Sequence, residues 1–104
     1  DILSVDGIDV GFIGYADLSL SMGLGLPPKW SEPVYLDAFD KVLNAAGRHG
    51  KIAGLHTNLG NGPRSIEWAI EQGFKMVTVC NVDDYIISGA QLALKRARKA
   101  AYRK

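Results

Sequence analysis

The sequence predicts an α/β fold in which short parallel strands alternate with helices. Three short apolar runs, at residues 8–13, 51–56 and 76–80, lack the polar–apolar alternation of half-exposed strands, which is typical of strands covered on both faces. Each run is followed by a helical pattern, and repeated strand–helix units imply parallel strands with right-handed crossovers. Three units make either a small open sheet or part of a (β/α)8 barrel, because a complete barrel needs about 250 residues.

Composition limits the class of protein. The 104 residues suffice for one domain at most, and 47% hydrophobic with 22% charged residues favours a globular core over disorder. A net charge of +1 gives no global attraction to nucleic acid, and no apolar run approaches the roughly 20 residues of a membrane helix. The single cysteine, Cys80, excludes an internal disulfide, so we expect a reducing, cytoplasmic compartment.

The first unit carries the most informative stretch. The apolar run Val10–Ile13 indicates a buried strand, Gly14 breaks it, and a Ser- and Gly-rich loop is expected over residues 19–25. Asp17 falls just past the strand, where α/β proteins place their chemistry. The spacing alone also allows Asp17 merely to cap a turn or a short helix through its side chain.

The next two units are marked by proline and glycine. Residues 24–33 hold three of the four prolines and predict a loop, after which Ser31 or Glu32 starts a helix with Pro33 in its first turn. A second loop at residues 57–63 ends in Pro63, which is placed to enter the next helix.

The last unit predicts a strand, a turn and a long helix. Cys80 lies in the apolar run, which indicates a buried small hydrophobic residue rather than a reactive thiol. Asp83 or Asp84 is a plausible N-cap, and the helix runs from about Tyr85 to the end. Its apolar stripe comprises Ile87, Ala90, Leu94, Ala97 and Ala101.

Three segments together resemble the HpcH/HpaI aldolase family. Residues 11–24, GFIGYADLSLSMGL, are similar to its signature at the end of a strand. Residues 52–58, IAGLHTN, resemble its seventh strand, and residues 67–90 resemble the following helix, the eighth strand and the start of the last helix. The resemblance implies that residues 1–104 form a single partial domain, the C-terminal three-eighths of a TIM (β/α)8 barrel.

The resemblance also implies a reaction. Members are class II aldolases that cleave 2-oxo-4-hydroxy acids to pyruvate and an aldehyde with Mg2+, Mn2+ or Co2+. It makes Asp17 one of two carboxylate metal ligands, and it places Gly14, Ala16 and Asp17 as substrate-binding residues around pyruvate. Hard cations prefer oxygen ligands, a metal stabilises the enolate that forms as the bond breaks, and small residues let backbone approach a small acid.

The sequence departs from the family pattern in two ways. Tyr15 stands where the family usually has proline. The second metal ligand, a glutamate, and the active-site Arg and His belong to earlier strands of the barrel. Since the chain begins at Asp1 in mid-pattern, we expect a fragment, or the ordered part, of a longer enzyme, inactive by itself.

Polar residues after the second and third strands are further candidates. His56 could face the barrel mouth as an acid–base group or ligand, or simply bond to a neighbour. Asn58, Asn61 and Asn81 fall in loops that face the active site of a barrel, but asparagine is also a good turn former. His49 lies in a polar turn and is expected to be solvated.

The alternative function is non-enzymatic: a structural α/β half-barrel or a phosphate-binding module. Residues 59–63, LGNGP, precede a helix whose N-terminus could hold a phosphate, but they lack the Lys and spacing of a P-loop.

Two further features bear on partners. Trp30 is expected to pack over its own loop or a neighbouring subunit. The six cations of residues 95–104 suit the C-terminal end of a solvated helix better than a nucleic-acid or membrane patch. The resemblance implies a homo-oligomer, a hexamer, in which last helices pack between subunits.

Overall fold

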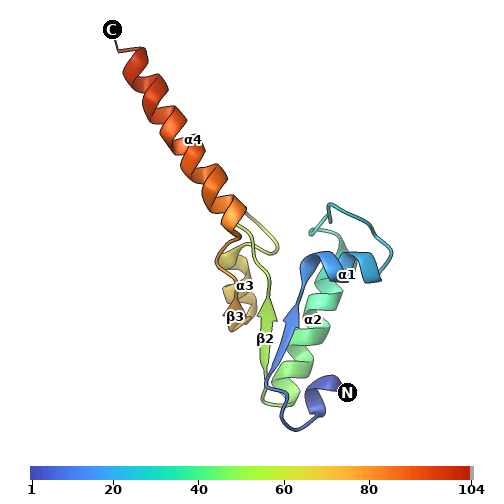
Figure 1. Cartoon of the computed structure of the whole chain (residues 1–104). Helices are drawn as coiled ribbons and strands as arrows, with labels where there is room; N and C mark the ends of the chain where they lie inside the picture. The colour runs from blue at the N-terminus through green and yellow to red at the C-terminus, as the bar shows by residue number, and fades with distance from the viewer. Residues whose placement is uncertain (104) are drawn as a thin grey trace.

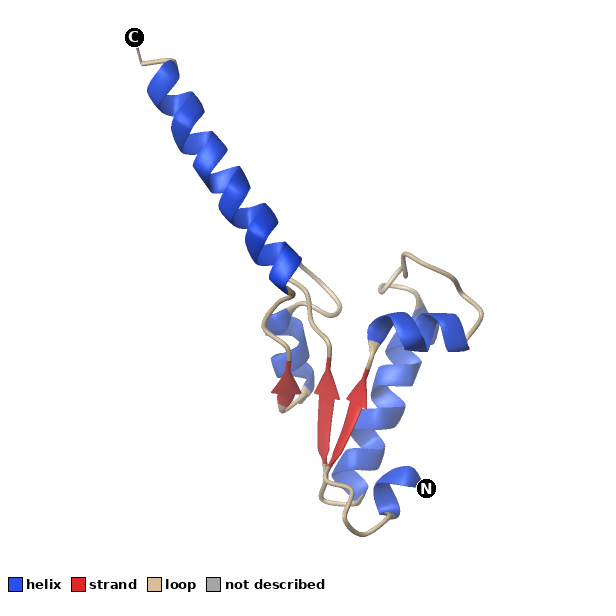
Figure 2. Ribbon diagram, in the orientation of Figure 1, coloured by secondary structure: helices blue, strands red, loops and turns tan. Residues whose placement is uncertain are grey.

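The fold is a three-stranded parallel sheet with two helices packed on one face (Figures 1 and 2). The computed structural model describes residues 1–103. The strands are ordered β1-β2-β3, as strand–helix repeats predict. The elements are η1 (Ile2–Ser4), β1 (Val10–Ile13), α1 (Tyr15–Ser21), α2 (Pro33–Arg48), β2 (Ile52–Leu55), α3 (Ile66–Gln72), β3 (Met76–Val77) and α4 (Val82–Ala101).

The core lies between the sheet and the helices α2 and α3. The strand residues that face these helices are Ile13, Ala53 and Leu55, and the last is fully buried. From α2, Tyr35 and Phe39 are each 1% exposed, so they fill the layer that joins sheet and helices. The other buried apolar side chains of the core are Leu3, Ala46, Ala69 and Phe74.

Within residues 1–103, no helix or loop covers the opposite face of the sheet. Parallel register places Phe12, Gly54 and Met76 in one row across the three strands, and Phe12 and Met76 are 44% and 50% exposed. The expectation of strands covered on both faces therefore holds for one face only. Contiguous exposed apolar rows of this kind are uncommon on the surface of monomeric proteins.

The segment after β1 is helical where a loop was expected. The prediction of a Ser- and Gly-rich loop over residues 19–25 is wrong for Ser19 and its neighbours, because α1 extends to Ser21. Ser19 is fully buried, and its hydroxyl is bonded to the Tyr35 hydroxyl at 2.8 Å and donates to the Gly25 carbonyl at 2.5 Å. These bonds satisfy the polar group and let the helix pack against α2.

The third strand is shorter than expected, since β3 ends at Val77. Cys80 therefore lies in a loop and is half-buried, rather than inside a strand as the sequence predicted. The last helix begins at Val82 with Asn81 as its N-cap, and the prediction of Asp83 or Asp84 as the cap is wrong. Instead, the carboxylate of Asp84 accepts a hydrogen bond from the Asn81 amide at 3.2 Å, as in a capping box.

Helix α4 extends away from the rest of the chain (Figure 1), and the molecule measures 65 × 27 × 20 Å. It contains no buried residue. The stripe residues Ile87 and Leu94 are each 55% exposed, so this helix lacks the packing that normally stabilises an amphipathic helix. Among the helices of residues 1–103, none has the length and apolar character that crossing a bilayer requires.

Candidate functional site at the carboxyl ends of the strands

The candidate site is the edge of the sheet where the three strands end (Figure 2). Each strand runs into a polar or small segment there: Gly14 to Asp17 after β1, His56 to Asn58 after β2, and Thr78 to Asn81 after β3. Parallel strands bring these segments to one edge, and such edges carry the chemistry of α/β proteins.

Asp17 lies in the first turn of α1, three residues after Gly14, which is the N-cap of this helix. Its Oδ2 is 2.9 Å from the position that a Cβ on residue 14 would occupy, so the absence of a side chain at Gly14 makes room for the carboxylate. No side-chain hydrogen bond caps α1. Asp17 is exposed, and its negative charge is favourable at a helix N-terminus.

His56 and Asn81 join the loops after β2 and β3. The Nε2 of His56 is 3.0 Å from Oδ1 of Asn81, and the Tyr15 ring meets the imidazole edge-on with centroids 4.6 Å apart. His56 thus has a bonded neighbour, which is the simpler of its two predicted roles. Asn81 comes to the site, whereas Asn58 Oδ1 accepts from the Gly60 amide at 2.8 Å and shapes a turn.

Two threonines fix the relative position of these loops. The Thr57 amide donates to Thr78 Oγ1 at 3.0 Å, and the Thr57 hydroxyl donates to the Thr78 carbonyl. Thr57 is 1% exposed. The pair continues the contact between the β2 and β3 segments beyond the last residues of the ladder.

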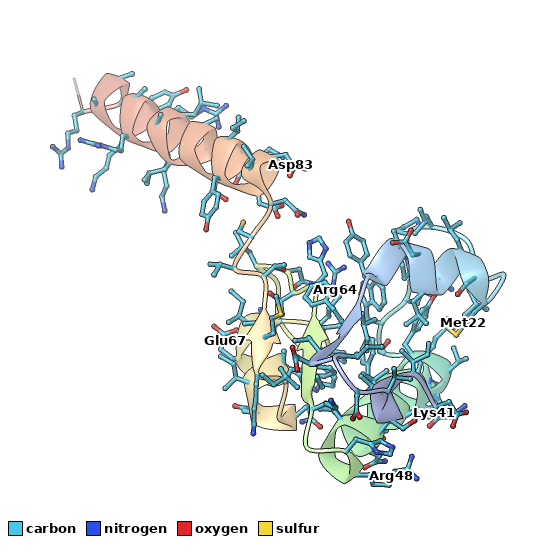
Figure 3. The ribbon with its side chains drawn as sticks, turned by 60° about the horizontal axis from the view of Figure 1, so that its bottom comes forward. Met22, Lys41, Arg48, Arg64, Glu67 and Asp83 are labelled. Atoms are coloured by element: carbon cyan, nitrogen blue, oxygen red, sulfur yellow. The ribbon has the colours of Figure 1, made fainter. Side chains whose placement is uncertain are left out.

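Arg64 is the site residue that sequence reasoning missed. Its guanidinium carbon lies 4.0 Å from the centroid of the Tyr15 ring and 4.7 Å from that of Trp30, both within cation–π range. Arg64 is only 8% exposed, and Figure 3 shows it beyond the carboxyl ends of the strands, far from Arg48. The sequence offered one signal, its place in the loop after the second strand.

The guanidinium of Arg64 is incompletely bonded. Its Nε and Nη1 are buried and have no hydrogen-bond partner within residues 1–103. Burial lowers the pKa of Arg64, while Tyr15 and the charge of Asp84 act in the opposite direction. Its backbone is also left-handed, with φ of 73°, a conformation that costs an L-residue about 1 kcal/mol.

Trp30 packs over its own chain. Its ring centroid is 4.8 Å from that of Tyr35 and 6.2 Å from that of Phe39, and it touches Tyr15 edge-on at 5.8 Å. The long proline loop is thereby anchored to α2. This packing holds the aromatic surface against which Arg64 rests.

The loop at residues 59–63 does not lead directly into a helix. Helix α3 begins at Ile66, later than Pro63 suggests, and Ser65 caps it by accepting from the Trp68 amide at 3.2 Å. One of the first-turn amides of α3 is therefore already bonded by the cap.

Of two other sequence candidates, His49 lies outside the site and Cys80 lies in its third segment, residues 78–81. His49 is exposed at the end of α2, as expected. The Cys80 thiol contacts Asp84 Oδ2 at 3.5 Å, and its partial burial together with this carboxylate raises the pKa of Cys80. A raised pKa disfavours the nucleophilic thiolate.

The donor set for a metal is incomplete within this chain. No group of three or more His, Cys, Asp or Glu side chains that could hold an ion occurs in residues 1–103. Asp17 offers an exposed carboxylate at the edge, where Gly14 leaves it room. The described residues therefore fit one oxygen ligand of a hard cation and do not by themselves form a metal centre.

Comparison with known proteins gives consistent relatives. No family model matches the chain. It is 31% identical over 87 residues to the 4-hydroxy-4-methyl-2-oxoglutarate aldolase tasA of Hapsidospora irregularis, covering 84% of this chain and 31% of that protein. It is 32% identical over 89 residues to the aldolase of the same name, cghB, from Chaetomium globosum, covering 86% and 32%. The chain thus spans about a third of the length of these curated relatives.

Solved structures agree on the fold. An HpcH/HpaI aldolase from Desulfitobacterium hafniense matches 99% of this chain and 37% of its own, with a TM-score of 0.65 and 25% identity. An HpcH/HpaI aldolase/citrate lyase family protein from Burkholderia cenocepacia matches 93% and 36%, with a TM-score of 0.79 and 24% identity. The three strands and their helices therefore correspond to part of an aldolase barrel. By sequence the chain is similar to part of two 4-hydroxy-4-methyl-2-oxoglutarate aldolases, and by fold it matches part of the HpcH/HpaI aldolase structures.

Proposed function

We propose that the chain is the C-terminal part of a carbon–carbon lyase that cleaves a 2-oxo-4-hydroxy acid to pyruvate and an aldehyde. The observation that carries this proposal is the position of Asp17, whose carboxylate lies over Gly14 at the carboxyl end of β1. Both curated relatives are named as aldolases, which supports the proposal.

The reaction is a retro-aldol cleavage. The bond between C3 and C4 of the substrate breaks, its electron pair becomes the enolate of pyruvate, and the 4-hydroxyl proton leaves as the aldehyde carbonyl forms. The enolate then takes a proton at C3. The small residues Gly14 and Ala16 allow the backbone to approach a bound pyruvate unit closely, and amide donors fixed there would require little reorganisation during reaction.

Asp17 would supply one carboxylate ligand to Mg2+, Mn2+ or Co2+, and the remaining ligands would come from outside these 104 residues. If bound there, such an ion would supply Lewis-acid stabilisation of the enolate. Within this chain Asp17 holds its carboxylate at the site edge, and Gly14 keeps that position open. The uncovered sheet face with Phe12 and Met76 suits a domain completed by further strands.

The proposal also concerns oligomeric assembly and the cellular compartment. Helix α4 has no buried residue and exposes an apolar stripe that includes Ile87 and Leu94, which suits packing against another subunit of a homo-oligomer. The free thiol of Cys80 suits a reducing cytoplasm.

The test is exchange of the methyl protons of pyruvate with deuterated water, followed by NMR on the intact protein with and without added Mn2+. We expect exchange that needs the metal and that Asp17→Asn abolishes. The matched control is Asp37→Asn, which removes an exposed carboxylate from α2. Exchange that persists in Asp17→Asn, or that ignores the metal, would contradict the proposal.

A further inference from the structure

We propose that His56 is a positioning residue of the aldolase site, and that it acts by joining the segment Gly14–Asp17 to the start of α4. This inference rests on the proposed function and adds a further residue to its site. His56 does not need to touch the substrate for this role. It fixes the backbone that the proposed function places around pyruvate, and its own ring is fixed by Asn81.

The first observation is the strand register beside Gly14. Strands β1 and β2 pair Ile13 with Leu55. The next pair in this register is Gly14 and His56, because Gly14 keeps an extended backbone with φ of −83° and ψ of 115°. The His56 amide donates to the Ile13 carbonyl at 3.2 Å. Neighbouring strands lie about 4.8 Å apart, so His56 is the β2-side neighbour of the segment that carries Asp17.

The second observation is the contact between the His56 side chain and Tyr15. The two rings meet edge-on, with centroids 4.6 Å apart, which is a favoured geometry for a pair of rings. Tyr15 is the first residue of α1 and lies between Gly14 and Ala16, the residues proposed to border pyruvate. His56 thus holds the chain on both sides of Gly14, through its amide before this residue and through its ring after it.

The third observation is that Asn81 fixes the imidazole. Nε2 of His56 lies 3.0 Å from Oδ1 of Asn81. An amide oxygen only accepts hydrogen bonds, so Nε2 carries the hydrogen and Nδ1 of the neutral ring is unprotonated. The ring is half-buried and is held from two sides, by this bond and by Tyr15. Because Asn81 is the N-cap of α4, the start of that helix sets the orientation of His56.

These contacts connect the three segments that meet at the carboxyl edge of the sheet (Figure 2). Tyr15 follows β1, His56 follows β2 and Asn81 lies after β3. A displacement of about 1 Å in a positioned group can cost a hundredfold in rate. Breaking the bond between His56 and Asn81 should therefore slow the reaction even where α4 keeps its cap.

The test uses two substitutions of Asn81 that both retain a favourable N-cap residue for α4. Asn81→Ser carries a hydroxyl one bond shorter, which does not reach the imidazole, whereas Asn81→Asp keeps an acceptor at the same distance. We expect metal-dependent exchange of pyruvate methyl protons to fall about 10- to 100-fold in Asn81→Ser and to recover most of its rate in Asn81→Asp. The matched control is His49→Gln, which changes an exposed histidine at the end of α2 and should leave exchange unchanged.

A second measurement does not depend on catalysis. Proton–nitrogen NMR of the imidazole at about pH 8, where an ordinary histidine is neutral, should show one tautomer of His56 in the unchanged protein and a mixture in Asn81→Ser. The amide signals of Tyr15 and Ala16 should shift in Asn81→Ser but stay in place in Asn81→Asp.

The outcomes separate the two proposals. Two tautomers in the unchanged protein, or amide signals of Tyr15 and Ala16 that ignore Asn81→Ser, would overturn the role of His56. Equal exchange rates in Asn81→Ser and Asn81→Asp would overturn it as well. Absence of metal-dependent exchange in the unchanged protein, with the NMR results as expected, would refute the aldolase proposal and leave the link between α4 and Tyr15 standing.

Discussion

The carboxylate of Asp17 occupies the space that a side chain at Gly14 would fill, with Oδ2 only 2.9 Å from the Cβ position. Gly14→Ala would therefore push the carboxylate aside. Because small displacements of a positioned group are costly in catalysis, we expect the exchange of pyruvate methyl protons to fall roughly 10- to 100-fold. The exchange assay under saturating Mn2+ measures this effect.

The backbone at Gly14 has φ of −83°, which any residue adopts, so Gly14→Ala should keep the fold. The matched control is Gly47→Ala in α2, where a new Cβ meets nothing within 4 Å. It should stabilise the helix by about 0.5–1 kcal/mol and leave exchange unchanged. Normal exchange in Gly14→Ala would mean that Asp17 does not need its observed position.

The local parts of the fold were predictable from sequence, and the parts decided by tertiary contacts were not. Pro33 marked a helix start that the structure confirms, because proline in the first turn of a helix is a local preference. Helix α1 was missed because its Ser19 is held by bonds to Gly25 and to Tyr35, 16 residues away.

The candidate site likewise contains one residue that local sequence reveals and one that depends on tertiary contacts. Asp17 was found because its place after an apolar strand is visible in the sequence, although a ligand role for it remains a prediction. Arg64 was missed because its burial depends on Tyr15 and Trp30, which come to it from other parts of the chain. No spacing rule indicates that an arginine after Gly-Pro will fold inward against two aromatic rings.

The Cys80 thiol should react slowly with iodoacetamide. Partial burial and the Asp84 carboxylate raise its pKa, so the thiolate forms at higher pH than in a free cysteine. Asp84→Asn removes the negative charge and should shift the alkylation rate profile to lower pH. By linkage, the stabilising effect of the protonated thiol is complete below its ordinary pKa and is lost as pH rises through the raised value.

The matched control for this titration is Asp83→Asn, because Asp83 is the weakest of the influences that raise the pKa of Cys80. Its alkylation profile should move less than that of Asp84→Asn. Identical profiles for the two variants would show that the contact between Cys80 and Asp84 at 3.5 Å has no influence on the thiol.

Gly54 is required by the packing of the uncovered sheet face. A Cβ there would lie 2.5 Å from Cδ2 of Phe12 and 3.2 Å from the Met76 carbonyl oxygen, and the carbonyl is part of the backbone and cannot turn away. Gly54→Ala should lower the free energy of unfolding by about 1–3 kcal/mol, measured by urea denaturation. Phe12→Leu in the same chain should restore part of the loss; no restoration would place the clash elsewhere.

The apolar stripe of helix α4 allows a test of the proposed assembly. Its residues recur at spacings of three and four, and no residue of the helix is buried. Such a 20-residue helix gains stability by burying its apolar side against a partner. We expect the double variant Ile87→Gln, Leu94→Gln to reduce the mass of the intact protein in sedimentation velocity, because each side chain is 55% exposed here. The control Lys95→Gln, Lys99→Gln changes cations outside the stripe and should leave the mass unaltered. An assembly that survives the loss of both Ile87 and Leu94 must be held by another surface, and α4 would then need a partner other than a second copy of this chain.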